Sequence, residues 1–134
     1  MAISFDNMIG IHDDALKIRS KRAELLASNI ANADTPNYKA QDIDFKQALE
    51  NSKLNRKPFG LNTTHEMHIE GQGFMPLDGD IKYRNISQPS VDGNTVDTHV
   101  EKAAFGKNTL EYTATLRFLS GKFTSMNKIL RARP

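Results

Sequence analysis

The sequence predicts a mainly α fold in which long N- and C-terminal helices pair as an antiparallel, coiled-coil-like hairpin around a small irregular or β middle region. Residues 1–33 contain no Pro and one Gly, whereas residues 34–95 hold four of the five Pro and five of the eight Gly. Residues 96–133 are again free of Pro, and Pro134 ends the chain. Because Pro and Gly interrupt helices, this distribution predicts an N-terminal helix (1–33), a middle region (34–95) and a C-terminal helix (96–134).

The N-terminal segment carries apolar residues at alternating spacings of four and three. This spacing averages about 3.5 residues, the period of a coiled coil. The predicted packing positions on this seam are Phe5, Ile9, Leu16, Leu26 and Ile30. His12 and Arg19 also fall on the seam. We expect them either to set the register of the helix pairing or to lie at its rim with their polar ends in water, and we favour this over a polar switch pair.

The C-terminal segment repeats the same spacing. Its predicted packing positions are Phe105, Tyr112, Leu116, Leu119, Phe123, Met126 and Leu130. Thr98 and Glu101 have the spacing of a capping box, which predicts a helix start between Asn94 and Thr98. Gly121 is expected where another helix approaches closely, since Gly costs about 1 kcal/mol in a helix interior.

The middle region shows weaker signals. Ile43 and Phe45 alternate with Asp residues, and Ile81 and Tyr83 alternate with basic residues, so each pair predicts a short strand. Residues 51–60 and 76–80 resemble loops or turns.

No motif of an enzyme or a metal site is complete. His65 and His68 are three residues apart, but a catalytic zinc site needs a third ligand and the H-E-x-x-H pattern needs a spacing of four. The short G-x-G at residues 71–73 lacks the third Gly and the helix start of a phosphate loop. We therefore predict no catalytic residue, no cofactor and no metal ion.

The composition also argues against several classes of function. The net charge is +2, too small to predict nucleic-acid binding, and the absence of Cys excludes disulfides and thiolate chemistry. The N-terminus lacks the basic and apolar regions of a cleaved signal peptide, and no stretch approaches the length of a membrane span.

Residues 28–38 form the most informative stretch, which predicts a helix exit with a defined turn. Asn32 can adopt a left-handed conformation, and Pro36 prevents further helix while favouring an extended Thr35. Asn29 and Asn32 on the last turn, followed by Thr35 and Tyr38, suggest side chains that hold the turn and a Tyr placed against the helix.

Two helices with apolar faces this wide cannot cover each other completely, and the polar middle region can cover only part of the remainder. Neighbouring subunits are the natural partners for the surplus.

The helix exit resembles the A-N-x-x-T-x-G-Y signature of the bacterial flagellar axial proteins, the rod and hook family. Residues 31–38 match it, with Asn37 where the family usually has Gly, and Asn is the next best residue at positive φ. The resemblance extends to three further stretches of the proximal-rod members, at residues 38–45, 92–97 and 118–122. The length of the chain also fits these members.

The resemblance implies a structural subunit of the proximal rod, which polymerises through its terminal helices and forms part of the shaft that transmits torque. Its implied partners are other copies of itself, the other proximal-rod subunits, the rod-base adaptor, the inner-membrane ring protein and the flagellar type III export apparatus. The implied location is the periplasmic rod of the basal body, reached without a cleaved signal peptide. Two alternatives remain open on the sequence: a soluble coiled-coil adaptor or chaperone, and a His-based metal-binding protein.

Overall fold

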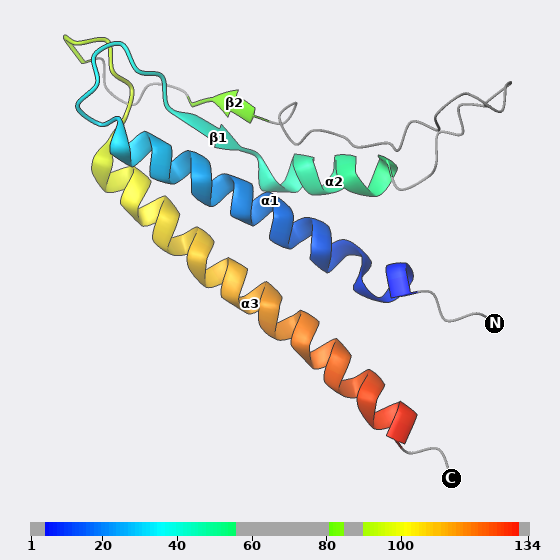
Figure 1. The fold of residues 1–134 in the computed structure, drawn as a ribbon. Helices are drawn as coiled ribbons and strands as arrows, with labels where there is room; N and C mark the ends of the chain where they lie inside the picture. The colour runs from blue at the N-terminus through cyan, green and yellow to red at the C-terminus, as the bar shows by residue number, and fades with distance from the viewer. Residues whose placement is uncertain (1–4, 56–80, 85–89, 132–134) are drawn as a thin grey trace, which may run out of the picture.

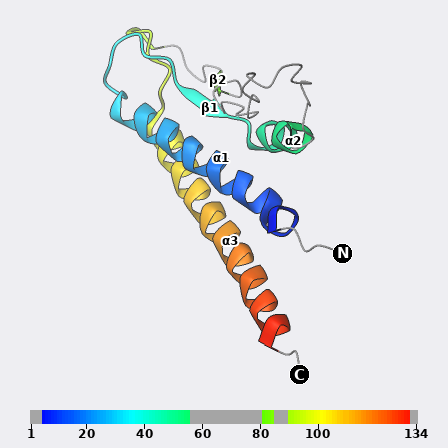
Figure 2. The ribbon, with the colours of Figure 1, turned by 45° about the vertical axis from the view of Figure 1, so that its right-hand side comes forward.

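The computed structural model describes residues 5–55, 81–84 and 90–131. In chain order the elements are α1 (Phe5–Ala31), β1 (Gln41–Ile43), α2 (Phe45–Asn55), β2 (Ile81–Tyr83) and α3 (Thr98–Arg131). Figures 1 and 2 show α1 between α3 on one side and the strands with α2 on the other. α1 and α3 run in opposite directions, meet at the end that carries the connecting loops, and diverge toward the two termini (Figure 1). The predicted fold class is confirmed.

α1 is shorter than the predicted helix and is broken near its start. Gly10 has φ 23° and ψ −107°, so two helical pieces meet at a kink. A residue with a Cβ would be strained at this positive φ, which explains why the only Gly of the segment lies here. The predicted seam is therefore not continuous from residue 5 onward.

α3 begins at Thr98, within the predicted interval, but the predicted capping box is wrong. The helix cap is Asp97, whose Oδ1 accepts hydrogen bonds from the backbone N–H groups of His99 (2.9 Å) and Val100 (3.3 Å). An acidic cap at this position satisfies two free N–H groups and complements the helix dipole. The Glu101 side chain is thereby left for other partners.

The middle region contains the two predicted strands and one helix that the sequence analysis missed. β1 and β2 are antiparallel, with Ile43 opposite Ile81. Phe45, predicted as part of a strand, instead begins α2, and residues 51–55, predicted as a loop, end it. Asp44 explains the change, because its Oδ1 accepts hydrogen bonds from the N–H groups of Lys46 (3.1 Å) and Gln47 (3.2 Å) and caps the helix. His65, His68 and residues 71–73 lie outside the described residues.

The apolar core lies between α1, α2 and the two strands. Ile18, Ile43 and Ala48 are its buried centre, and Leu25, Phe45, Leu49 and Ile81 pack around them. α3 contributes no residue to this cluster. The association of α1 with α3 must therefore rest on other contacts.

We predict that Ile18→Ala lowers the free energy of unfolding by about 2–5 kcal/mol, because Ile18 is fully buried and its truncation leaves a cavity. Urea unfolding followed by circular dichroism measures the change. The matched control is Ile129→Ala at a residue that is 73% exposed, with an expected change below about 0.5 kcal/mol. Equal effects of the two substitutions would contradict this placement of the core.

Candidate functional site

The end of the hairpin where α1 and α3 meet, formed by residues 32–39 and 90–97, is called the head. Asn94 joins its two segments. Its Nδ2 donates to the backbone oxygens of Asn32 (3.1 Å), Ala33 (2.6 Å) and Thr35 (3.0 Å). Its Oδ1 accepts from the N–H of Val96 at 2.8 Å. One buried side chain thus connects the exit of α1 to the entry of α3.

The predicted turn residues hold the exit of α1 as side-chain caps. Asn32 Nδ2 donates to the backbone oxygen of Ser28 (2.8 Å), and Thr35 Oγ1 donates to Asn32 Oδ1 (3.2 Å). Pro36 is exposed at the tip of the turn. The left-handed residue of the turn is Asn37, with φ 61°, at the position where the resemblance implied a positive φ, and the left-handed conformation suggested for Asn32 was wrong. The Asn32 side chain instead continues the hydrogen bonding of the helix by donating to the backbone oxygen of Ser28.

Asn37 is also the contact between the two segments of the head. Its N–H donates to the backbone oxygen of Asp92 at 2.9 Å. Its Oδ1 lies so close to Gly93 that a Cβ at that position would be 2.6 Å away. Gly93 has φ 69°, so both its conformation and its surroundings favour Gly.

Asn29, one turn before the exit, is completely buried and fully hydrogen-bonded. Its Nδ2 donates to the backbone oxygen of Gln41 (2.8 Å) and to Glu101 Oε2 (3.0 Å). Its Oδ1 accepts from the N–H of Gln41 (3.1 Å) and from the hydroxyl of Tyr38 (3.3 Å). The predicted placement of Tyr38 against the helix is confirmed by this contact. Asn29 thereby connects α1, β1 and α3.

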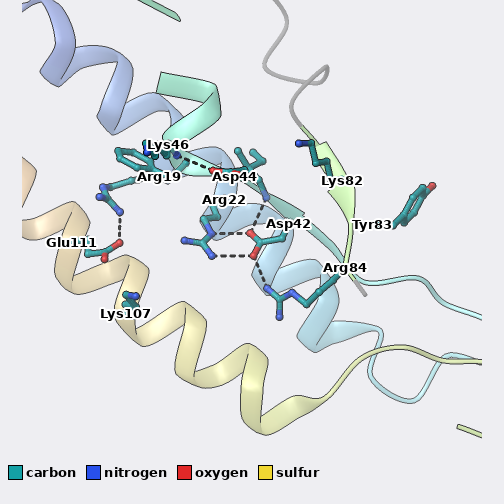
Figure 3. A pocket seen from close by; sticks show the side chains of 12 residues that line it. Arg19, Arg22, Asp42, Asp44, Lys46, Lys82, Tyr83, Arg84, Lys107 and Glu111 are labelled. Carbon is teal, nitrogen blue, oxygen red and sulfur yellow. Dashed lines mark hydrogen bonds and ion pairs between the residues drawn. The ribbon is translucent and has the colours of Figure 1, made fainter. Parts of the chain in front are cut away.

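A chain of ion pairs extends from Glu101 across the strands to α1. Figure 3 shows the part of it that Arg84, Asp42 and Arg22 form. Arg84 donates to Glu101 Oε1 (2.5 Å) and to Asp42 Oδ2 (2.6 Å). Arg22 binds the same Asp42 carboxylate through Nε (2.7 Å) and Nη2 (2.9 Å). The geometry of Arg22 and Asp42 is the bidentate form, which is the stronger kind of ion pair.

Burial by itself would raise the pKa of Asp42, but the hydrogen bonds from Arg22 and Arg84 outweigh it and hold the pKa below its ordinary value. The ionised carboxylate is therefore the form that the folded protein favours. Asn29 and Glu101 are buried and Asp42, Arg84 and Arg22 are half-buried, and we call the network of these five residues the polar clasp.

Farther along the helices, α1 and α3 are joined by a second set of polar contacts. Arg19 pairs with Glu111, and its guanidinium lies over the ring of Phe45 with 3.9 Å to the ring centroid. Asn108 Nδ2 donates to the backbone oxygen of Arg19 at 2.9 Å. Glu101 and Asn108 are the buried residues of α3, and both contact α1. Arg19 thus takes part in the pairing of the helices.

Several of these residues were not singled out from the sequence: Arg22, Asp42, Arg84, Asn108 and Glu111. Glu101 was assigned to the wrong role. The one local signal is the spacing of Glu101 and Asn108, seven residues apart, which places two polar side chains on one line of α3.

The predicted packing residues have different environments. On α1, Leu26 is fully buried within the chain, Ile9, Leu16 and Ile30 are half-buried, and the side chain of Phe5 is outside the described part. On α3, Tyr112, Leu119 and Met126 are half-buried. Phe105, Leu116, Phe123 and Leu130 are exposed. Gly121 also faces open space within the chain, since a Cβ added at this position would meet nothing within 4 Å.

Within residues 5–55, 81–84 and 90–131, no group of three or more His, Cys, Asp or Glu could hold a metal ion. No helix in the same ranges is long and apolar enough to cross a membrane. The ionisable and amide groups of the site join chain segments to one another, and much of the apolar surface of α3 faces outward. These features define a structural subunit: a helical hairpin whose two helices are joined next to the head by the polar clasp.

Comparison with known proteins agrees with this class. The family model of the flagella basal body rod proteins matches residues 10–39, which include the exit of α1. The flagellar basal body rod protein FlgB of Aeromonas hydrophila is 52% identical over 132 residues, which cover 98% of each chain. FlgB of Escherichia coli K12 is 38% identical over 98% of this chain and 99% of the relative. FlgB of Salmonella typhimurium is 39% identical over 94% of each chain.

The chain belongs to the FlgB family of flagellar basal body rod proteins. It is a structural rod protein of the flagellar basal body and not an enzyme, as the sequence analysis predicted.

We predict that Gly93→Ala costs more stability in the natural chain than in an Asn37→Gly background. In the natural chain the new Cβ meets Asn37 Oδ1, whereas in the Asn37→Gly background only the positive φ remains, at a cost of about 1–2 kcal/mol. Urea unfolding of the four variants of this double-mutant cycle gives the coupling free energy. A coupling near zero would show that the two turns are not in the contact described.

We predict that Asp42 makes the stability of the protein depend on pH. Because the folded pKa of Asp42 is lowered, its ionised form contributes stability above the unfolded pKa of about 3.9, and this contribution is lost as the pH falls through the folded pKa. Asp42→Asn should therefore be less stable than the natural chain at pH 7, and the difference should shrink toward pH 3. The measurement is the free energy of unfolding in urea between these pH values.

The control for this pH series is Asp13→Asn, which removes an exposed pair with Lys17 and should change stability little at any pH. A difference between Asp42→Asn and the natural chain that stays constant from pH 7 to pH 3 would contradict the role of Asp42.

Proposed function

We propose that this chain is a subunit of the proximal part of the rod, where it polymerises through its terminal helices and forms part of the shaft that transmits torque. The observation that carries this proposal is the exposed apolar surface of α3. Leu130, Phe118 and Ile129 are 65%, 66% and 73% exposed in the single chain. An apolar surface of this extent on one helix is characteristic of a surface that another protein covers.

Part of the predicted seam of α3 lies within this exposed surface. Phe105, Leu116, Phe123 and Leu130 recur at the coiled-coil spacing and are exposed, so they are available to a neighbouring helix. The half-buried residues Ile9, Leu16 and Ile30 supply the corresponding positions on α1. Leu26 is already covered by the chain itself and offers no surface to a neighbour.

The divergence of α1 and α3 supports the same proposal. The two helices are in contact at the polar clasp and separate toward the termini (Figure 1). A helix from another subunit that enters this divergent region would bury both apolar faces at once. Interfaces that bury large apolar areas in this way are typical of permanent assemblies.

The proposed partners are other copies of the chain, the other proximal-rod subunits, the rod-base adaptor and the inner-membrane ring protein. The proposed location is the periplasmic rod, reached through the flagellar type III export apparatus without cleavage. The absence of Cys means that no step of this route depends on a disulfide.

The test uses a strain that lacks the gene and is complemented with variants of the full chain. We expect Leu116→Gln with Leu130→Gln to abolish swimming in soft agar and to reduce the yield of rods in purified basal bodies, because two apolar contacts with neighbours are lost. The control, Arg117→Gln with Lys128→Gln, alters exposed charged residues of the same helix and should retain motility. Normal rods with the first variant, or normal rods in the strain without the gene, would contradict the proposal.

A further inference from the structure

An open hollow of about 480 Å³ lies between α1, α3 and the strands, beside the polar clasp (Figure 3). Six cationic side chains line it: Arg19, Arg22, Lys46, Lys82, Arg84 and Lys107. Three acidic residues, Asp42, Asp44 and Glu111, line it as well. We call it the basic hollow, because its lining has an excess of three positive charges.

The three carboxylates are already engaged. Asp42 holds Arg22 and Arg84, and Glu111 pairs with Arg19. Asp44 accepts the N–H groups that cap α2. The excess charge therefore resides on three lysines that have no carboxylate partner among the described residues.

Each of these lysines comes from a different element. Lys46 and Lys107 are exposed on α2 and α3, and Lys82 of β2 donates only to the neutral amide of Gln47. Cations that line one concave surface add to the positive potential there. The natural ligand of such a hollow is a group of carboxylates.

A matching acidic surface exists on the head of the same chain. Asp34, Asp92 and Asp97 are exposed there, and Lys39 is the one cation of the two segments. The Lys39 ammonium donates to the backbone oxygen of Gly93 at 3.1 Å. The hydrogen bonds of Asn94 and Asn37 hold the two segments together, so the carboxylates of Asp34 and Asp92 are presented on one rigid end of the hairpin.

We propose that the basic hollow of one subunit binds the acidic head of a second copy of this chain. This inference rests on the proposed assembly and names one of its contacts. The head lies at the end of the hairpin (Figure 1), whereas the residues that line the hollow belong to α1, α2, α3 and the strands along its side, so one molecule cannot bring its own two surfaces together. A contact between two different surfaces of identical chains is heterologous and produces a ring or an open helical filament.

The test measures self-association of the full chain at low ionic strength by sedimentation velocity. We expect Lys46→Glu with Lys107→Glu in the hollow to lower the association constant at least tenfold. Asp34→Lys with Asp92→Lys in the head should have the same effect. An equimolar mixture of the two variants should associate like the natural chain, because the reversed head fits the reversed hollow. Added salt should weaken the self-association of the natural chain measured at the same protein concentrations, because it screens the charges of the hollow and the head.

The matched control is Lys53→Glu with Lys102→Glu, which makes the same charge change on exposed residues of α2 and α3 outside the hollow. Its association constant should stay within threefold of the natural value. Far-UV circular dichroism checks that each variant keeps its helix content. If the Glu variant loses helix, Lys46→Gln with Lys107→Gln replaces it, with an expected loss of at least threefold.

A second readout uses the natural absence of Cys. Asp34→Cys and Lys107→Cys chains, mixed in equal amounts and oxidised, should give the mixed disulfide dimer well above the roughly twofold excess over either homodimer that random pairing produces, whereas Lys102→Cys in place of Lys107→Cys should give only that random ratio. The inference is overturned by a natural chain that stays monomeric, by no recovery in the mixture, or by binding of inorganic phosphate without an effect on association. Normal association of the hollow variant overturns it as well. None of these results bears on the seam variants, so the proposed function stands or falls separately.

Discussion

The carboxamide of Asn29 is the point on which the arrangement of the described elements depends. It is buried completely, and its four hydrogen bonds reach the backbone of β1, the hydroxyl of Tyr38 and the carboxylate of Glu101. A buried amide or carboxylate without partners costs about 1–3 kcal/mol or more, so each of these elements must be in place before the others are stable. Arg84, at the end of β2, pairs with Glu101 and Asp42, and Asp42 pairs in turn with Arg22 of α1. The strands and α1 must therefore also be in place for these charges to have partners. The polar clasp thus helps to fix the position of α3, which contributes no residue to the cluster around Ile18.

In this arrangement polar contacts pair α3 with α1, while the large apolar residues of α3 remain free for contacts outside the chain. The residues that α3 buries within the chain are Glu101 and Asn108, whereas large apolar residues such as Phe118 and Ile129 face outward. Polar contacts with defined geometry determine which helix is paired and in which register, because a shifted pairing would leave buried charges without partners. The apolar surface then remains available for neighbours.

The sequence predicted the parts of the fold that repeat locally. Apolar spacing and the distribution of Pro identified both long helices, and the residues of the exit of α1 identified the turn, because these signals lie within a few positions of one another. Asp42, Arg84 and Glu101 could not be found in the same way, since they meet through contacts 17 and 42 residues apart and each is an ordinary charged residue in its own segment. α2 was missed because a helix of 11 residues offers few apolar repeats, and its cap, Asp44, also fits a strand that alternates Asp with apolar residues. Gly10 was noted as the one Gly of its segment, but only its φ of 23° shows that it breaks the helix.

The position of the clasp along the chain has a consequence for the time at which the protein can fold. Its partners extend from Arg22 to Glu101, so the hairpin cannot close on any fragment that lacks either end of this interval. If the chain passes through the proposed export channel with its N-terminus first, Glu101 must have left the channel before Asn29 can bind the Glu101 carboxylate. If the C-terminus leads, an even longer stretch must emerge. Under the proposed export route, the polar clasp therefore cannot form until most of the chain has left the channel.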